Sequence, residues 1–363
     1  MINILGLFPL TGNGGIASWT KKFLASFPDN NYQITTVNVS PSSDSTKRKN
    51  IIYRSLSGIE ALIRIYRDAK FILNSRHIDI LHTTTSGNIG AFRDWVIANL
   101  CKNKGVKTIM HCRYGCITEN YHAKNLIGYL TRKSMNKFDQ IWVLDSRSYN
   151  TLMQKPALEK KVYLTPNSIE IKNKIDDSPK TYKRIAFIGN LIPSKGLYEL
   201  VEASILTDVR LDIIGPGTDK VINHIKGIAK DKLNKSIFIH GKLPNNEAVR
   251  FMQDVDIVAL PTYYPSEAFP ISILEAMSLT KMVISCPRAA IKDMLTDLEG
   301  KPCGILVPPQ DVKSIVDAIN WCQSHSLEAD TMRKKAFEKV YTEYRTEVVY
   351  NLYRSCYQKL INS

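Results

Sequence analysis

The sequence predicts an α/β protein built from two Rossmann-like domains that face a cleft. The chain has 363 residues, which exceeds one ordinary hydrophobic core and suits two domains of common size. Short apolar runs rich in β-branched residues alternate with helical patterns, and this alternation occurs twice, before and after a polar stretch. Such a rhythm is typical of parallel sheets covered by helices.

The first half shows this alternation up to Leu164. The expected strands are 2–7, 33–39, 78–82, 106–110, 140–144 and 162–164, and the expected helices are 17–26, 58–74, 87–103 and 122–137. We therefore predict a first domain over residues 1–166, followed by a charged linker over 167–183.

The alternation restarts at Arg184. The expected strands are 184–188, 210–214, 237–240, 256–260, 282–285 and 304–307, which predicts a second domain over 184–344. A long amphipathic helical region follows over 329–361. We expect its end, from about 345 to 363, to pack back on the first domain through Val348, Leu352 and Tyr357.

The composition predicts a soluble, cytoplasmic protein. Hydrophobic residues make up 44% of the chain and charged residues 23%, and no run of eighteen apolar residues or export signal is seen. The seven cysteines are odd in number and scattered, as is typical of reduced thiols. Cys112 and Cys116 lie near His111, but no second cysteine pair completes a set of ligands, so we predict no metal site.

The positive charge is concentrated in the first half. Residues 1–161 hold 23 of the 49 basic and 10 of the 34 acidic residues, a net charge of +13, against +2 for the rest. Basic residues accompany apolar helical faces at 47–49, Arg64, Arg67, Lys70, Lys102, Lys104, Lys107, Lys124, Arg132, Lys133 and Lys137, beside Ile59, Leu62, Ile63, Tyr66, Leu126, Ile127 and Leu130. Two interpretations stay open: an anionic membrane surface or lipid pyrophosphate binds there, or the basic residues form a solvated exterior. No motif indicates a nucleic acid partner.

Gly12, Gly14 and Gly15 follow the first expected strand and precede its helix, expected from about Ala17. Glycines at this point let the backbone approach a diphosphate, and the helix start adds N–H donors. A simple tight turn is the alternative. The spacing also fits a dinucleotide pattern, but residues 37–39 offer no acid for a ribose, which argues against an NAD-dependent dehydrogenase.

His82 and His111 end expected strands, where open α/β sheets bind ligands. Arg113 follows closely and is a candidate contact for an acceptor or a phosphate. An ordinary structural role is the alternative for both histidines.

Lys195 lies between the first strand of the second half and the next helix. A lysine at a helix mouth can neutralise a leaving diphosphate, although a lone lysine is more often a surface charge.

Residues 261–276 carry the most specific signal. Glu267 and Glu275 lie eight positions apart around a helix start, with Pro270 suited to the first helical position. The expected core face of this helix consists of Ile271, Ile273, Leu274 and Met277. A polyhydroxylated, phosphate-bearing ligand would use both carboxylates and the helix start, whereas the alternative is two surface acids favoured by the helix dipole.

This stretch resembles the signature of the family 4 retaining glycosyltransferases, which have the GT-B fold: Ser-x-x-Glu-Gly-Phe-Pro-Leu-x-x-x-Glu-Ala-Met. Here Ala268 replaces the glycine, Ile271 the leucine, and Thr280 a glycine after the helix. Gly189 and Lys195 also match the family, but Asn190 replaces an arginine that clamps phosphates. The resemblance extends over nearly the whole chain.

The resemblance implies a donor site. Its residues are Gly14, Gly15, Gly189, Asn190, Lys195, Glu267, Ala268, Phe269, Pro270, Ile271 and Glu275. Glu275 would hold the ribose and Glu267 the sugar, while Lys195 and the glycine loop hold the diphosphate. His111 matches a family histidine near the donor sugar, so His111, Glu267 and Lys195 are the expected catalytic residues. Arg113 and His82 are expected on the acceptor side.

The implied reaction moves a sugar, with retention, from a UDP- or GDP-sugar to a hydroxyl of a lipid-linked glycan. Synthesis of O-antigen or capsule at the inner face of the cytoplasmic membrane is the expected context, with the protein peripheral to that membrane. No cofactor is expected, because by family analogy the departing phosphate deprotonates the acceptor. Two alternatives stay open: a GT-B nucleotide-sugar 2-epimerase and a non-catalytic two-lobed sugar-binding protein.

Overall fold

Two units make up the chain in the computed structural model, which describes residues 1–12, 14–40, 51–87 and 89–363. Unit 1 comprises Met1–Pro166 and Tyr350–Ser363, and unit 2 comprises Asn167–Val349. The basic stretch 47–49 and Asn13 lie outside the described residues. Within the described ranges, no helix is both long enough and apolar enough to cross a membrane.

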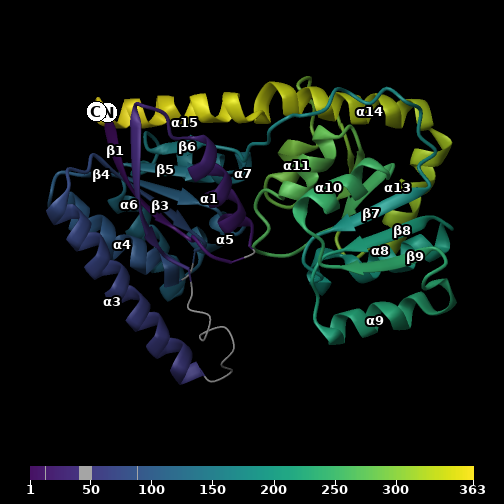
Figure 1. The fold of residues 1–363 in the computed structure, drawn as a ribbon, viewed down its shortest axis with the longest axis horizontal. Helices are drawn as coiled ribbons and strands as arrows, with labels where there is room; N and C mark the ends of the chain where they lie inside the picture. The colour runs from purple at the N-terminus through teal and green to yellow at the C-terminus, as the bar shows by residue number, and fades with distance from the viewer. Residues whose placement is uncertain (13, 41–50, 88) are drawn as a thin grey trace. The chain divides into compact units, whose positions relative to one another are not determined.

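A six-stranded parallel sheet forms the centre of unit 1 (Figure 1), in the order β2-β1-β3-β4-β5-β6. The strands are β1 (Ile2–Phe8), β2 (Tyr32–Asn38), β3 (Ile80–Thr85), β4 (Lys107–Cys112), β5 (Gln140–Val143) and β6 (Val162–Leu164). The helices are α1 (Gly15–Ser26), α3 (Ile51–Ser75), α4 (Ile89–Lys102), α5 (Ile117–His122), α6 (Leu126–Lys137) and α7 (Ser146–Met153), joined by the end of α15 (Thr346–Ile361).

The two faces of this sheet differ in chemistry. Because side chains alternate along a strand, Met110 and Ile141 face an aliphatic core that contains residues of α3, α4 and α6. His111 and Trp142, their immediate neighbours, face the opposite side and contact aromatic rings of α1 and α15. Helices on both faces explain why the strands read as continuous apolar runs.

Unit 2 has its own six-stranded parallel sheet, in the order β12-β11-β10-β7-β8-β9. The strands are β7 (Arg184–Ile188), β8 (Arg210–Ile214), β9 (Ile237–Gly241), β10 (Ile257–Leu260), β11 (Met282–Ser285) and β12 (Ile305–Leu306). The helices are α8 (Leu197–Leu206), α9 (Asp219–Ala229), α10 (Asn245–Gln253), α11 (Ile271–Ser278), α12 (Ile291–Met294), α13 (Val312–Ser324) and α14 (Ser326–Lys339), with short 3₁₀ helices η1 (Pro193–Lys195) and η2 (Lys230–Lys232).

The elements confirm the predicted α/β class, with local differences. Strands β3 and β4 continue past their predicted ends to Thr85 and Cys112. The predicted helix 122–137 starts later, at Leu126, because Asn125 caps α6 and accepts a bond from the Gly128 N–H, and the separate helix α5 ends at His122. The predicted region 329–361 is also interrupted, by a π-helical turn over Val340–Tyr344 and an extended Arg345.

Only part of the predicted C-terminal contact is correct. Tyr357 is fully buried in unit 1, but Leu352 is 37% exposed and Val348 is half-buried. The buried positions instead include Tyr350 and Tyr353, on the same face of the helix as Tyr357.

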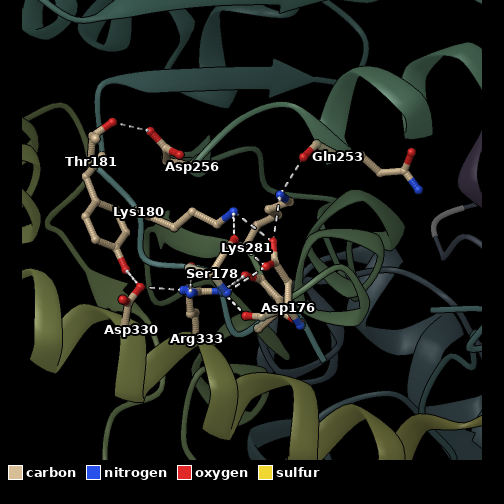
Figure 2. Close-up of polar contacts among 11 residues, drawn as sticks. Asp176, Ser178, Lys180, Thr181, Gln253, Asp256, Lys281, Asp330 and Arg333 are labelled. Carbon is tan, nitrogen blue, oxygen red and sulfur yellow. Dashed lines mark hydrogen bonds and ion pairs between the residues drawn. The ribbon is translucent and has the colours of Figure 1, made fainter. Parts of the chain in front are cut away.

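Residues 176–183, predicted as part of a linker, lie in unit 2 and are held by one buried arginine (Figure 2). The Arg333 guanidinium donates to the carbonyl oxygens of Asp176 at 2.6 Å and Ser178 at 2.6 Å. It also donates to the Thr280 carbonyl at 3.1 Å and to Asp330 at 2.7 Å. Because these backbone groups find partners in unit 2, the segment is an ordered strap.

Candidate functional site

At the carboxyl edge of the unit 2 sheet, a glycine allows two loops to pack closely against each other. Gly196 has φ +72, and a Cβ on it would lie 2.1 Å from the carbonyl oxygen of Pro261. No other residue fits there, so the loop after β7 packs against the loop after β10. The Tyr263 N–H also donates to the Ser194 carbonyl at 2.9 Å. This packing brings two distant sequence motifs together.

Lys195 and Glu267 form an ion pair at this junction. Lys195 Nζ lies 2.9 Å from Glu267 Oε2, and the two side chains are 15% and 13% exposed. A Cβ on Gly189, which has φ +155, would lie 3.7 Å from Lys195 Nζ. Asn190 is exposed. The structure thus places a donor cation and an acceptor carboxylate side by side in a partly dehydrated position, where their attraction is stronger than in water.

Glu275 lies on α11 and is 9% exposed. Its Oε1 accepts a bond from Asn245 Nδ2 at 3.4 Å. Pro270 is the N-cap, one position before its predicted place. Of the four residues predicted to face the core, only Ile271 is half-buried rather than buried.

The backbone between the two glutamates is pinned by two hydrogen bonds. Ala268 and Phe269 are buried, and the Ala268 carbonyl accepts from the Ala290 N–H at 3.0 Å. The Phe269 carbonyl accepts from Asn167 Nδ2 at 2.9 Å. Sequence reasoning gave no role to Asn167, because its partner lies 102 positions away in the chain.

In unit 1, the glycine loop leads directly into α1. The helix begins at Gly15, two residues before the predicted start, and Gly14 is its N-cap with extended backbone. A Cβ on either would meet no atom within 4 Å, so packing does not demand glycine there. Gly12 has φ +108, which favours glycine at that position. The first-turn N–H groups of α1 remain suited to an anion.

His82 and His111 are fully buried within their strands, not at the strand ends as predicted. His82 Nε2 lies 3.2 Å from His111 Nδ1, and His111 Nε2 lies 3.0 Å from Arg113 Nη1. Burial lowers the pKa of His82 to about 3, and burial together with Arg113 lowers the pKa of His111 well below its usual value. Both imidazoles are therefore neutral at physiological pH.

Cys112, which lies near His111 in the sequence, is inside the core of unit 1. Cys112 is buried, and burial raises the pKa of its thiol. In the part of the chain that the structure describes, no three His, Cys, Asp or Glu side chains gather as a metal site would require.

Comparison with known proteins identifies the domain that carries the glutamates. Residues 168–339 match the family model of glycosyl transferases group 1. Unit 2 is a group 1 glycosyltransferase domain. The match contains Lys195, Glu267 and Glu275, together with the strap.

Relatives of the group 1 domain include glycosyltransferases from archaea and bacteria. The chain is 24% identical to the uncharacterized glycosyltransferase MJ1178 of Methanocaldococcus jannaschii, over 85% of each chain. It is 21% identical to MJ1069 of the same organism over 62% of each chain. It is 27% identical to the D-rhamnosyltransferase WbpZ of Pseudomonas aeruginosa over 41% of this chain and 38% of that protein. The matches to MJ1069 and WbpZ thus span less than two thirds of those proteins.

Solved structures show the fold of the whole chain. Sucrose-phosphate synthase from Thermosynechococcus elongatus aligns over 100% of both chains, with a TM-score of 0.78 and 14% identity. Anabaena HepE in complex with UDP aligns over 99% of this chain and 100% of that chain, with a TM-score of 0.74 and 14% identity. The chain accordingly has the GT-B fold.

Proposed function

We propose that this protein is a retaining glycosyltransferase that moves a sugar from a UDP- or GDP-sugar to a hydroxyl of a lipid-linked glycan in bacterial surface polysaccharide synthesis. The Lys195–Glu267 ion pair carries the proposal, since it lies at the carboxyl edge of a group 1 domain. A nucleotide sugar offers a partner to each group: a diphosphate for the cation and hydroxyls for the carboxylate.

In the proposed complex, Lys195 stabilises the diphosphate as its negative charge grows, and Glu267 accepts hydroxyl bonds from the sugar. Glu275, with Asn245 beside it, accepts hydroxyl bonds from the ribose. The pinned backbone at Phe269 keeps the sugar contacts in place. Catalysis by such a site is electrostatic and positional, because its groups contact the leaving group and orient the reacting atoms.

Neither a metal nor a cofactor takes part in the proposed reaction, and the departing phosphate takes the acceptor's proton. Full activity after dialysis against a chelator supports this, whereas a loss that added divalent cation restores overturns it. The anomeric configuration of the product, followed by NMR, tests retention: an inverted product contradicts the proposal.

The donor is best identified by ligand stabilisation. HepE binds UDP, and WbpZ transfers D-rhamnose, so the first gives a nucleotide and the second a sugar, and neither gives a complete donor. A thermal-shift panel of uridine, guanosine and adenosine diphosphates and their sugars distinguishes them, because a ligand that binds only the folded state raises Tm by mass action. No response to any member would contradict the proposal.

A lipid-linked acceptor fits the surface of unit 1. On α3, Ile59, Ile63 and Phe71 are 56%, 61% and 71% exposed, and Arg67 and Lys70 are exposed on the same helix. A hollow of about 440 Å³ beside β2 is lined by Arg67, Phe71 and neighbouring residues. Exposed apolar side chains next to cations suit the surface of an anionic membrane.

Substitution of the donor residues tests the site directly. We expect Lys195→Met, Glu267→Gln and Glu275→Gln each to lower kcat/KM for donor turnover by about 10²- to 10³-fold, the range measured for single electrostatic contacts in other enzymes. Lys301→Met and Glu299→Gln provide matched controls, because this ion pair of 3.1 Å in the same unit is exposed. Donor variants as active as these controls would refute the site.

A further inference from the structure

Unit 1 contains a continuous chain of buried polar side chains. The Tyr357 hydroxyl lies 2.6 Å from His82 Nδ1, and His82 Nε2 lies 3.2 Å from His111 Nδ1. His111 Nε2 then lies 3.0 Å from Arg113 Nη1. Both histidines and Tyr357 are fully buried, whereas Arg113 keeps 6% of its surface exposed. The chain therefore runs from the protein interior toward one partly accessible cation.

Arg113 fixes the direction of every bond in this chain. A guanidinium only donates hydrogen bonds, so His111 Nε2 accepts and His111 carries its proton on Nδ1. That proton is donated to His82 Nε2, which places the His82 proton on Nδ1 as well. His82 Nδ1–H then donates to the Tyr357 oxygen. One arginine thus sets the tautomers of two histidines.

The same geometry removes His111 from contact with a ligand. Both of its ring nitrogens have protein partners, and none of its surface is exposed. The ring is also covered by Trp19 and Trp142, at centroid distances of 5.1 Å and 5.4 Å. The titratable and charged groups around it are His82, Arg113 and Tyr353.

Arg113 is held from other sides as well. Its guanidinium carbon lies 4.1 Å from the centroid of the Trp19 ring, a cation–π contact. The Tyr353 hydroxyl donates to the Pro166 carbonyl at 3.2 Å and accepts a hydrogen bond from Arg113. Trp19 belongs to α1, just after the glycine loop, and Arg113 is the first residue after β4. The cation is thereby fixed at the carboxyl edge of the sheet.

We infer that Arg113, and not His111, is the unit 1 side chain that contacts the substrate, where it binds phosphate oxygens. His111, His82 and Tyr357 are positioning residues that hold the guanidinium. This inference rests on the proposed glycosyl transfer. A planar, preorganised guanidinium pairs with phosphate through parallel N–H···O bonds, and a fixed side chain loses little entropy when it does so. The phosphate belongs either to the nucleotide sugar or to a lipid-linked acceptor.

Kinetics of Arg113→Gln and Arg113→Lys test the contact in the full-length protein. We expect Arg113→Gln to lower kcat/KM about 10- to 100-fold and Arg113→Lys to retain more activity than Gln, since one charge-assisted bond is of that size. Weaker binding of the nucleoside diphosphate assigns the contact to the donor, whereas a raised KM for the acceptor alone assigns it to the acceptor. Arg76→Gln is the control, since it removes an exposed positive charge from the same unit.

Histidine NMR tests the positioning chain without an activity assay. With ¹⁵N-labelled histidine, we expect two side chains with the proton on Nδ1 and constant shifts from pH 5 to 8. Arg113→Gln changes the Nε2 shift of His111, and Tyr357→Phe changes the Nδ1 shift of His82 and lowers kcat/KM less than Arg113→Gln does.

Two results would overturn the inference while the proposed function stands: Arg113→Gln with wild-type kinetics and wild-type phosphate binding, or a His111 signal that titrates near pH 6.5. Failure of the wild-type protein to bind any nucleotide sugar is a different outcome, which removes the proposed function itself.

Discussion

The carboxyl edges of the two sheets differ in how far their charged and polar side chains are buried. Unit 2 keeps Lys195 and Glu267 partly exposed and paired with each other. Unit 1 buries its polar side chains among aromatic rings, with two neutral histidines between Tyr357 and Arg113. A partly solvated ion pair can exchange partners at low cost, whereas a buried chain of hydrogen bonds cannot be broken without leaving unsatisfied groups. Unit 2 is thus suited to exchange ligands and unit 1 to hold one cation still.

The largest expected effect is on the stability of unit 1. It comes from the aromatic face, which is the side of the unit 1 sheet that contacts the aromatic rings of α1 and α15. Phe23 is fully buried and contacts Phe8, Trp19, Phe27 and other rings. We expect Phe23→Ala to lower the free energy of unfolding by about 3–5 kcal/mol, because a large buried ring leaves a cavity. Urea denaturation measures the change.

The control for Phe23 is Leu352→Ala, on the exposed side of α15, which we expect to change stability by under about 0.5 kcal/mol. Equal effects of the two substitutions would show that the aromatic face does not stabilise unit 1.

A buried lysine in unit 2 provides the next test. Lys281 is almost fully buried, and its ammonium donates to the Gln253 carbonyl at 2.6 Å (Figure 2). Burial lowers the pKa of Lys281 to about 8. Between pH 8 and about 10.4 the unfolded chain binds more protons than the folded one, so stability rises with pH in that window.

We expect Lys281→Met to abolish this rise, which is on the order of 2–3 kcal/mol for a shift of this size. Chemical denaturation at pH 7.5 to 10.5 gives the difference from wild type. Lys301→Met, at an exposed lysine, serves as the reference. If the free energy of unfolding of Lys281→Met changed with pH in the same way as that of Lys301→Met, burial would not lower the pKa of Lys281.

A single hydroxyl tests the hydrogen-bonded chain of unit 1. Tyr357→Phe keeps the ring but leaves the His82 Nδ1–H without its acceptor, so we expect a loss of about 1–2 kcal/mol. Thermal denaturation of Tyr129→Phe, on an exposed tyrosine, should match wild type. A Tyr357→Phe protein as stable as that control would indicate that the chain contributes no net stability.

The smallest expected effect on stability comes from the ion pair of unit 2. A double-mutant cycle of Lys195→Met and Glu267→Gln should give a coupling of about 0.5–1 kcal/mol in stability, reduced by added salt. This small effect on stability would contrast with the 10²- to 10³-fold loss of kcat/KM expected for the same two substitutions. A coupling of several kcal/mol would make this pair a structural feature like the buried chain of unit 1.

Strand positions could be predicted because both faces of each sheet are buried, which leaves a continuous apolar signal. The ends of β3 and β4 were harder. Thr83 to Thr85 extend β3 although they are polar, because threonine is β-branched and their hydroxyls find partners such as the Leu7 carbonyl. For that reason His82 lies inside a strand and not at the ligand edge.

The site was predictable where its residues are close in sequence. Glu267 and Glu275 lie on one loop and helix, but the partner of Glu267 comes from 72 positions away and that of His82 from 275 positions away. Such pairs depend on tertiary packing, which periodicity does not encode.

Thr280 is a single residue that also depends on contacts from distant parts of the chain. It stands where the family has a glycine and has φ +56, a conformation that glycine adopts readily. Its hydroxyl accepts a hydrogen bond from the Asp176 N–H at 3.0 Å, and its carbonyl oxygen accepts one from Arg333. The strap therefore stabilises a residue type that the backbone alone disfavours.

The division of unit 1 into two chain segments has a consequence for synthesis. Unit 2 is continuous, whereas unit 1 takes Tyr350–Ser363 from beyond it. On the ribosome, the aromatic face formed by β1, β3 and α1 must wait for Tyr353 and Tyr357 until all of unit 2 has been made. Domains usually mature in the order in which they are translated. Here the first unit to emerge is completed only after unit 2, so its aromatic face stays uncovered while residues 167–349 are made.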